Sequence, residues 1–378
     1  MNLLENYSLL PHNTFGMDVY ARYFAEYDTV EELADFLQTD LARSHKLLPI
    51  GAGSNLLFTG DYDGIVLHSR IRFCTIVGDT PDEVLVRVGS GVVWDDFCAD
   101  MCARGFGGIE NLSYIPGEIG ASAVQNIGAY GVEAKDVIVC VETIETATGQ
   151  AHTFDAAACD YGYRHSIFKS ELQGRYIVTA VTYRLQKKPT LRLDYGNLRD
   201  TLSHIAHPTV ADVRRAVIDI RRQKLPEPAE LGSAGSFFKN PVVPAAQFEA
   251  LRAQYPSMPH YPAGDAQVKI PAAWLIEQCG WKGKTVGGAA VYDKQPLVLV
   301  NKNHATPADV QTLAQQIVDS VITKFNIKID AEANYIYYEK QIYYHTIFTI
   351  GVCQLRCCYT IVADLYIKDK TNDFSQER

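Results

Sequence analysis

Three side chains that lie far apart in the sequence are of the types needed to hold a carboxylate and to move a proton. Arg164 lies among aromatic residues in YGYRHSIFK, and an arginine can hold a carboxylate through two parallel hydrogen bonds. Ser236 follows a glycine and precedes two phenylalanines in GSAGSFFKNP, where its hydroxyl could donate a proton. Glu332 lies in IDAEANYI, near the start of an apolar terminal strand, and could point into a cleft.

Each of these residues also has a purely structural interpretation. Arg164 could stack on a tyrosine at the surface, Ser236 could serve a turn, and Glu332 could be a solvated carboxylate at a sheet edge. Ser236 is not the nucleophile of a GxSxG elbow, because no glycine stands two residues after it.

Two glycine-rich segments could bind a phosphate-bearing cofactor. IGAGSNL, residues 50–56, superficially matches a dinucleotide fingerprint, but Leu56 takes the third glycine position and strand-like sequence follows it. We therefore exclude a Rossmann motif. What remains is a turn whose amides can converge on an anion, although this segment alone favours a plain tight turn.

The second segment is NLSYIPGEIGASAVQNIGAYG, residues 111–131. Its small residues let backbone approach a ligand closely and expose amide donors, which suits a pyrophosphate and the polar edge of a flavin. An irregular structural loop is the alternative, but a loop this long is unusual without a function. We expect no regular element here.

Composition narrows the class of protein. The 378 residues carry a net charge of -9, which disfavours binding to nucleic acid or to an anionic membrane. The nine cysteines form no paired zinc pattern, so we predict reduced thiols and no metal site. The first residues do not look like a secretory signal, and we expect a cytoplasmic protein.

The elements that must position these residues alternate irregularly between strands and helices, which favours an α+β fold. Helical spacing appears at residues 30–38 and 210–224, and a capping pattern begins a long helix near Pro307. We divide the chain into four segments: 1–71, with a terminal strand near 333–340 added to it, then 72–223, 224–332 and 341–378. The last is apolar and rich in cysteine, and we predict a β-hairpin of unknown role.

Taken together, the motifs resemble one family over roughly residues 12–336. IGAGSN, IPGEIGASAVQNIGAYG, YRHSIFK and GSAGSFFKNP are similar to the UDP-N-acetylenolpyruvoylglucosamine reductase (MurB) family, and LDYGNL resembles the tyrosine loop of its type I members. The resemblance implies an FAD-binding domain of the vanillyl-alcohol-oxidase type, built from two α/β subdomains, followed by a C-terminal α+β substrate-binding domain.

The resemblance also implies a reaction and its cofactors. NADPH reduces FAD, and the enolpyruvyl ether of a UDP-sugar then takes a hydride from flavin N5 to give UDP-N-acetylmuramate for peptidoglycan synthesis. Arg164 and Glu332 would stabilise the enolate, with Glu332 protonated, and Ser236 would deliver the proton. The oligomeric state is open, with a monomer favoured. The rival interpretations are an oxidase of small alcohols or sugars and a non-catalytic flavin- or nucleotide-sugar-binding protein.

Binding residues follow from the matching motifs. Substrate contacts are expected from Tyr195, Lys224, Asn240 and Lys269. FAD contacts are expected from Gly51, Gly53, Ser54, Asn55, Leu56, Tyr114, Pro116, Gly117, Gly120, Ala121, Gln125, Asn126, Gly128, Ala129 and Gly131. The sequence departs from the family where Asn334 replaces the usual arginine, and in the residues after about 340.

Overall fold

The N-terminal segment folds into a four-stranded sheet, and one of its strands leads into the first glycine-rich loop. The structure, a computed structural model, describes residues 1–337. The strand order is β1-β2-β5-β3, with β1 antiparallel to β2 and the other pairs parallel. The bounds are β1 Asn2–Ser8, β2 Tyr20–Tyr27, β3 Leu47–Ile50 and β5 Tyr62–Ser69, with η1 Leu10–His12, α1 Val30–Leu37 and α2 Asp40–Ser44 between them. The helix predicted at 30–38 is confirmed, and the Thr29 side chain caps it.

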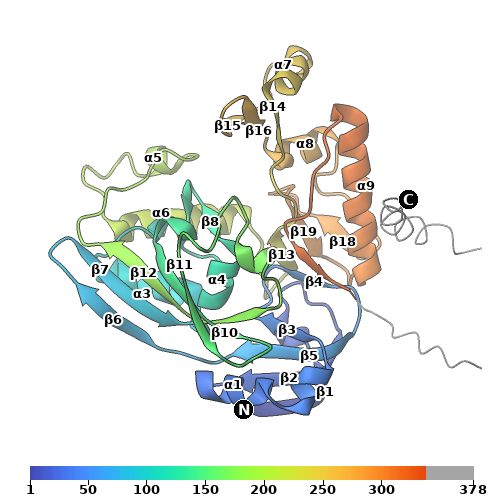
Figure 1. Cartoon of the computed structure of the whole chain (residues 1–378). Coiled ribbons are helices and arrows are strands. Elements are labelled where there is room, and N and C mark those ends of the chain that lie inside the picture. The colour runs from blue at the N-terminus through green and yellow to red at the C-terminus, as the bar shows by residue number, and fades with distance from the viewer. Residues whose placement is uncertain (338–378) are drawn as a thin grey trace, which may run out of the picture. The chain divides into compact units, whose positions relative to one another are not determined.

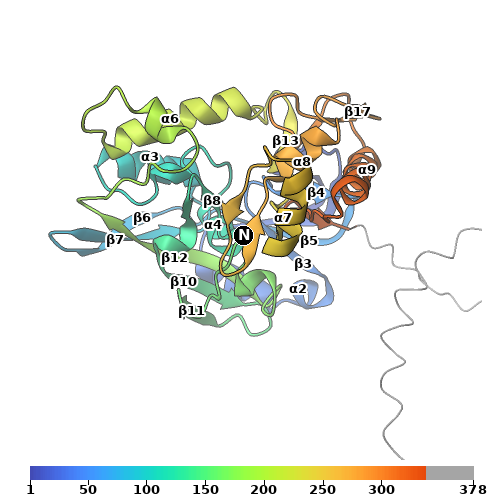
Figure 2. The same cartoon turned by 90° about the horizontal axis from the view of Figure 1, so that it is seen from above.

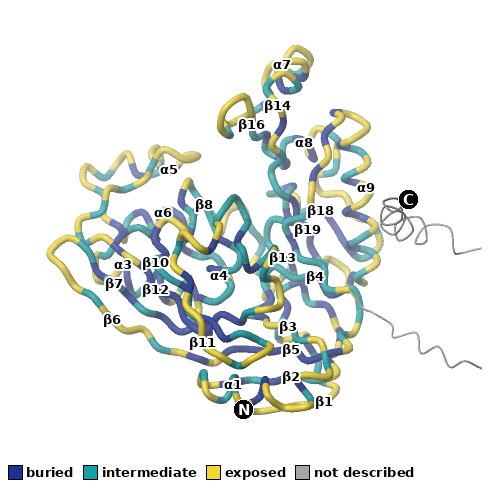
Figure 3. Tube along the Cα trace, viewed as in Figure 1, coloured by how far each residue is buried: buried dark blue, intermediate teal, exposed yellow. Residues whose placement is uncertain are grey.

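A second sheet follows, in the order β11-β10-β12-β7-β6, with all pairs antiparallel. Its strands are β6 Cys74–Asp79, β7 Glu83–Gly89, β10 Ile138–Glu145, β11 Ala151–Asp155 and β12 Tyr176–Gln186. Residues 177–183 of β12 are all buried, so this strand lies at the centre of the core (Figure 3). The helices α3 Trp94–Ala103 and α6 Val210–Lys224 contact each other, and α4 Ile119–Gln125 contacts β12.

The glycine-rich stretch 111–131 differs from our expectation because it contains regular structure. It includes the end of η2 Glu110–Leu112, the whole of α4, and β8 Gly128–Ala129, which pairs with β9 Val132–Glu133 before η3 Ala134–Asp136. The small residues of α4 allow the helix to lie close to neighbouring backbone, since a side chain on Gly120 would approach the Ser90 Cβ to 3.0 Å. Asn126 ends the helix in the left-handed conformation, at a φ of 44°.

The third segment contains two small sheets and the longest helix among the described residues (Figure 1). One sheet has the order β13-β19-β18-β17, and the other β14-β16-β15. The elements are β13 Gly232–Ser236, β14 Val242–Pro244, α7 Ala245–Gln254, β15 Tyr261–Pro262, β16 Gln267–Lys269, α8 Ala272–Gln278, β17 Thr285–Val286, β18 Ala289–Val291, β19 Val298–Asn301 and α9 Pro307–Phe325. The predicted capping signal of α9 is confirmed, because Thr306 and Asp309 form a reciprocal capping box.

Residues 334–336 return to the start of the fold. The strand β20 Asn334–Ile336 pairs in parallel with β4 Leu56–Phe58, directly after the first glycine-rich loop. In Figure 2, which views the molecule from above, α6 lies beside α3, which it contacts. The remaining elements are η4 Ile167–Lys169 and α5 Leu198–Thr201. Within residues 1–337, no helix is long and apolar enough to cross a membrane. The predicted tail 341–378 lies outside the described residues.

Candidate active site

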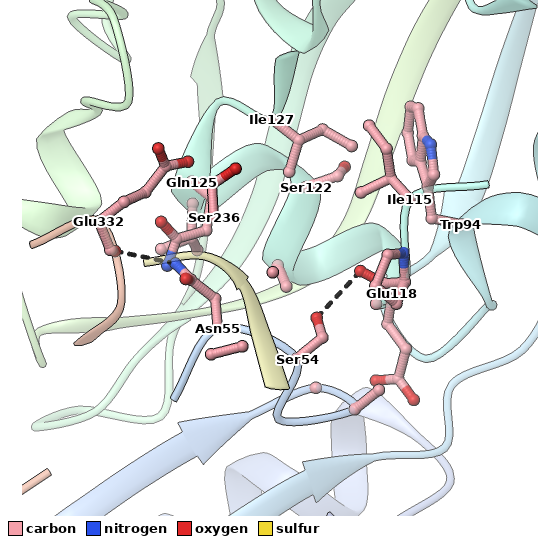
Figure 4. A pocket seen from close by; sticks show the side chains of 18 of the residues that line it. Ser54, Asn55, Trp94, Ile115, Glu118, Ser122, Gln125, Ile127, Ser236 and Glu332 are labelled. Carbon is pink, nitrogen blue, oxygen red and sulfur yellow. Dashed lines mark hydrogen bonds between the residues drawn. The ribbon is translucent and has the colours of Figure 1, made fainter. Parts of the chain in front are cut away.

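The two glycine-rich loops, the arginine turn and the segments of Ser236 and Glu332 line one cavity of about 510 Å³ (Figure 4). This volume is within the usual range for a small-molecule site. The predicted site residues that line it are Gly51, Gly53, Ser54, Asn55, Leu56, Pro116, Gly117, Gly120, Ala121, Gln125, Gly128, Ala129, Arg164, Tyr195, Lys224, Ser236, Asn240 and Glu332. In Figure 4, Gln125, Ser236 and Glu332 lie toward one end of the cavity, and Ser54, Trp94 and Glu118 lie toward the other.

A tight turn presents Arg164 to the cavity. Gly162 and His165 exchange two backbone hydrogen bonds of 3.1 Å, and Arg164 between them adopts a positive φ of 55°. A non-glycine residue in this conformation is strained, so the surroundings must hold it. The Arg164 Nη2 donates to the Gly128 carbonyl at 2.7 Å, and the Asn126 Nδ2 donates to the Gly162 carbonyl at 2.7 Å. Gly128 in β8 therefore fixes the guanidinium, and Asn126 at the end of α4 fixes the turn that carries it.

Backbone pairing brings Ser236 and Glu332 together. The amide of Glu332 donates to the Phe237 carbonyl at 2.8 Å, and the amide of Lys239 donates to the Asp330 carbonyl at 2.9 Å. Asn55 joins this junction, because its Nδ2 donates to the Glu332 carbonyl at 3.2 Å. The first glycine-rich loop, the end of β13 and the residues before β20 thus share one hydrogen-bonded junction.

Arg164 and Glu332 form an ion pair with each other, an arrangement that the sequence did not predict. Both side chains are mostly buried, at 17% and 14% exposed. Burial alone lowers the pKa of Arg164, but the charge of Glu332 and its hydrogen bond outweigh burial, so the pKa is raised. The guanidinium stays charged at the point where a substrate carboxylate could meet it.

The loop 51–55 has the features of an anion site. Gly53 has a φ of 64°, and a side chain on it would strike the His12 carbonyl, so only glycine fits. The backbone N–H groups of Ala52, Gly53 and Ser54 donate to no acceptor within residues 1–337. Ser54 reaches across the cavity wall, where its Oγ donates to the Pro116 carbonyl at 2.9 Å. A diphosphate would satisfy such free amides, so these residues fit the pyrophosphate of FAD.

Positively charged side chains of α6 line part of the cavity wall. Lys224 and Arg221 are three residues apart near the end of this helix, so they share a face. Burial lowers the pKa of Arg221, while nearby Tyr130 and Asp95 oppose that effect. Tyr195 also lines the cavity and stacks on Tyr261, with the ring centroids 5.9 Å apart. These groups could hold a phosphorylated substrate in this part of the cavity.

Four predicted binding residues do not line the cavity. The hydroxyl of Tyr114 donates to Glu227 at 2.6 Å, and the Nδ2 of Asn126 supports the arginine turn. Gly131 has a φ of 79° in the turn between β8 and β9. The Nζ of Lys269 lies 4.2 Å from the centre of the Tyr163 ring, which does line the cavity. Of the four, Asn126 holds the turn that carries Arg164, and Lys269 lies over the cavity-lining ring of Tyr163. Asn240, although in the wall, accepts the Ala272 amide at the start of α8 with its Oδ1.

Sequence reasoning missed several side chains of the wall, including Tyr163, Arg221, Glu118 and Gln295. Tyr163 adjoins Arg164, and Arg221 precedes Lys224 by one helical turn, so spacing could have indicated both. It also missed Lys169, whose Nζ donates to the Gln125 Oε1 at 2.7 Å and so orients that amide. Burial, helped by Lys239, lowers the pKa of Lys169 to about 8. No sequence signal indicates Gln295.

The fold and the cavity define a flavoprotein class. The family model described as "FAD binding domain" matches residues 21–155, which contain the free amides and both glycine-rich loops. The model described as "UDP-N-acetylenolpyruvoylglucosamine reductase, C-terminal domain" matches residues 227–336, which contain Ser236 and Glu332.

Whole-chain relatives agree with both matches. A UDP-N-acetylenolpyruvoylglucosamine reductase of Bacteroides fragilis is 53% identical, over 88% of this chain and 99% of that protein. A protein of the same name from Burkholderia ambifaria is 46% identical, over 88% of this chain and 96% of that protein. Another from Porphyromonas gingivalis is 44% identical, over 89% of this chain and 100% of that protein. The chain belongs to the UDP-N-acetylenolpyruvoylglucosamine reductase family, as its motifs predict.

A solved structure supports the fold. The reductase of Thermus caldophilus matches with a TM-score of 0.62 at 21% identity, over 88% of this chain and 98% of that one. The predicted α+β fold with an FAD-binding domain is confirmed.

Proposed function

We propose that this protein is an FAD-dependent reductase that converts the enolpyruvyl ether of UDP-N-acetylglucosamine into UDP-N-acetylmuramate, with NADPH as the reductant. The observation that carries the assignment of residues is their convergence. Arg164, Ser236 and Glu332 come from three distant segments and line the same cavity as the free amides of loop 51–55. FAD, when bound, supplies the hydride chemistry, and the protein must orient and stabilise.

The residues at the end of the cavity near Ser236 suit the reacting part of the substrate. The Arg164 guanidinium can pair with the substrate carboxylate, and charge that develops beside it is stabilised strongly in a buried site. Glu332 pairs with Arg164 in this structure and holds the guanidinium in place. We propose that Glu332 is protonated when it faces the substrate carboxylate, because two ionised carboxylates would repel each other. We assign to the Ser236 hydroxyl the transfer of a proton to the carbon next to the carboxylate, since Ser236 lines the same cavity.

The residues near α6 suit the nucleotide part. We assign Lys224 and Arg221 to the diphosphate, because they offer positive charge on an otherwise acidic protein. Tyr195 and Asn240 complete this part of the wall, and Lys269 acts through Tyr163. We further propose that the protein works in the cytoplasm, where NADPH is held reduced. We propose that it acts as a monomer.

Separate measurement of the two half-reactions tests the role of Ser236. In Ser236→Ala, NADPH should bleach the yellow oxidised protein at close to the wild-type rate. Recovery of the colour on adding the enolpyruvyl nucleotide sugar should slow by about 100-fold or more, because a positioned proton donor typically contributes about 10²–10⁴ in rate. Equal slowing of both half-reactions would remove Ser236 from the proton-transfer step.

A further inference from the structure

A buried histidine lies between two glutamates beside the cavity, and the proposed mechanism uses none of the three. The His68 Nδ1 lies 2.9 Å from the Glu26 Oε1, and its Nε2 lies 3.1 Å from the Glu118 Oε1. Glu118 lines the cavity and is only 5% exposed, and His68 is 7% exposed. Buried charges of this kind are costly unless they are paired, so the arrangement needs a reason.

The geometry suits a doubly protonated imidazole. Ionised carboxylates only accept hydrogen bonds, so a ring nitrogen that faces each of them must donate. Burial alone lowers the pKa of His68, but its hydrogen bonds to Glu118 and Glu26 and their charges outweigh burial, so the pKa is raised. His12, whose ring centre lies 5.1 Å from that of His68, has a pKa lowered first by burial and then by His68. One positive charge is thus shared between two carboxylates.

The second oxygen of Glu118 is left for a ligand. Within residues 1–337, its Oε2 has no hydrogen-bond partner, and it lies so close to Gly51 that a side chain there would come within 3.1 Å of it. Glu118 stands at the N-cap position of α4, yet its side chain makes no capping hydrogen bond. The Glu118 carboxylate therefore does not cap α4 and lies at the cavity wall instead.

The position of Glu118 indicates what it binds. It lies beside Gly51 and Ala121, next to the free amides of the loop 51–55, and away from Ser236 and Glu332 (Figure 4). A carboxylate is repelled by a diphosphate, whereas a hydroxyl group of the same ligand can donate a hydrogen bond to the carboxylate. Sugar hydroxyls donate well to carboxylates, as when an acidic residue holds the ribose of a dinucleotide.

We propose that Glu118, oriented by the imidazolium of His68, accepts a hydrogen bond from a hydroxyl of bound FAD, on either its ribose or its ribityl chain. The inference rests on the proposed placement of FAD in this cavity. Glu118 is then a binding residue, His68 is a positioning residue, and Glu26 anchors His68 from β2.

Titration of apoprotein with FAD, followed by quenching of flavin fluorescence, tests the proposal. Glu118→Gln should raise the FAD Kd by about 10- to 100-fold, because a hydrogen bond to a charged group typically contributes about 1.5–3 kcal/mol. Glu142→Gln is the matched control. It removes a glutamate paired with Arg87 at 2.6 Å in the second sheet, and the Kd should not change.

Two FAD analogues identify the hydroxyl, one lacking a ribose hydroxyl and one lacking a ribityl hydroxyl. One of them should bind wild-type protein more weakly than FAD does, and Glu118→Gln should bind that analogue and FAD about equally. His68→Gln should lose the same discrimination, which a general loss of stability would not produce. Melting curves of the apoproteins show whether each variant is folded.

Two outcomes would contradict the expectation, one for the Glu118 contact alone and one for the proposed function itself. If Glu118→Gln binds FAD as tightly as wild type does, or if no analogue is discriminated, the proposed contact is wrong while the flavoenzyme remains. If wild-type apoprotein binds no FAD at all, the proposed function fails first.

Discussion

At the scale of single residues, the position of Arg164 depends on Gly128, which has no side chain. Gly128 accepts a hydrogen bond from Arg164 through its carbonyl, and the guanidinium occupies the space where a side chain on Gly128 would lie. The added Cβ would be 2.8 Å from the Arg164 Nη1, and also 3.0 Å from the Glu133 Cγ. The guanidinium would therefore have to move. The backbone of Arg164 is already held in a strained conformation.

We therefore expect Gly128→Ala to lower turnover by about 100-fold or more, since a misplacement of about 1 Å in a catalytic group can cost this much. Steady-state kinetics with saturating NADPH measure the effect. Gly174→Ala is the control, because Gly174 also has a special conformation, with a φ of 76°, but a side chain there meets nothing within 4 Å. Wild-type turnover in Gly128→Ala would show that the position of Arg164 does not limit the reaction.

At the scale of elements, one ion pair fastens α6 to α3. Arg214 in α6 donates to both carboxylate oxygens of Asp95 in α3, at 2.6 and 2.9 Å. The Tyr114 amide, in the second glycine-rich segment, donates to the same carboxylate. Burial alone raises the pKa of Asp95, but these hydrogen bonds outweigh burial and lower it. The pair thus helps to set the place of the helix that carries Lys224.

Asp95→Asn should lower the free energy of unfolding by about 1–3 kcal/mol, because a charged hydrogen-bond partner is lost from a mostly buried arginine. Since the folded pKa is lowered, this contribution is present above the unfolded pKa of Asp95 and is lost as pH falls through the folded pKa. Urea unfolding at neutral and acidic pH should show a difference between the proteins that shrinks in acid. Asp100→Asn, which breaks an exposed pair with Arg104 in the same helix, should cost less than about 1 kcal/mol. A larger loss for Asp100→Asn than for Asp95→Asn would contradict this account.

At the scale of the described molecule, the cavity wall is discontinuous in sequence. The residues that line it run from Tyr27 to Glu332, so a ligand in it touches every predicted segment from 1 to 332. A bound cofactor should therefore stabilise these segments together, by an amount set by its affinity.

Removal of FAD should lower the melting temperature, and unfolding should remain one cooperative transition. At an FAD concentration about 1,000 times its Kd, binding should add about 4 kcal/mol to the free energy of unfolding. Calorimetry of apoprotein across a range of FAD concentrations measures the shift, and FMN, which lacks the adenylate half, should shift it less. A ligand-sensitive transition accompanied by a second, insensitive one would show that the segments unfold separately.

The sequence was enough to predict the local elements and most residues of the cavity wall. It was not enough where contacts between distant residues determine the structure. Helices 30–38 and 210–224 carry their own apolar spacing, and Thr306 with Asp309 marks the start of α9. The helix α4 was missed because glycine and alanine give no apolar periodicity, and its stability comes from packing. The Arg164–Glu332 pair and the role of His68 were missed because 168 and 50 residues separate the partners.

The pairing of β20 with β4 has a consequence for how the protein is made. A ribosome delivers the first glycine-rich loop early, but Glu332 and the strand beside that loop emerge some 277 residues later. Until then, the loop lacks its hydrogen-bonded neighbour and Arg164 lacks its counter-ion. A growing chain should thus be unable to assemble a complete pocket, so tight capture of flavin would have to wait until translation has passed β20.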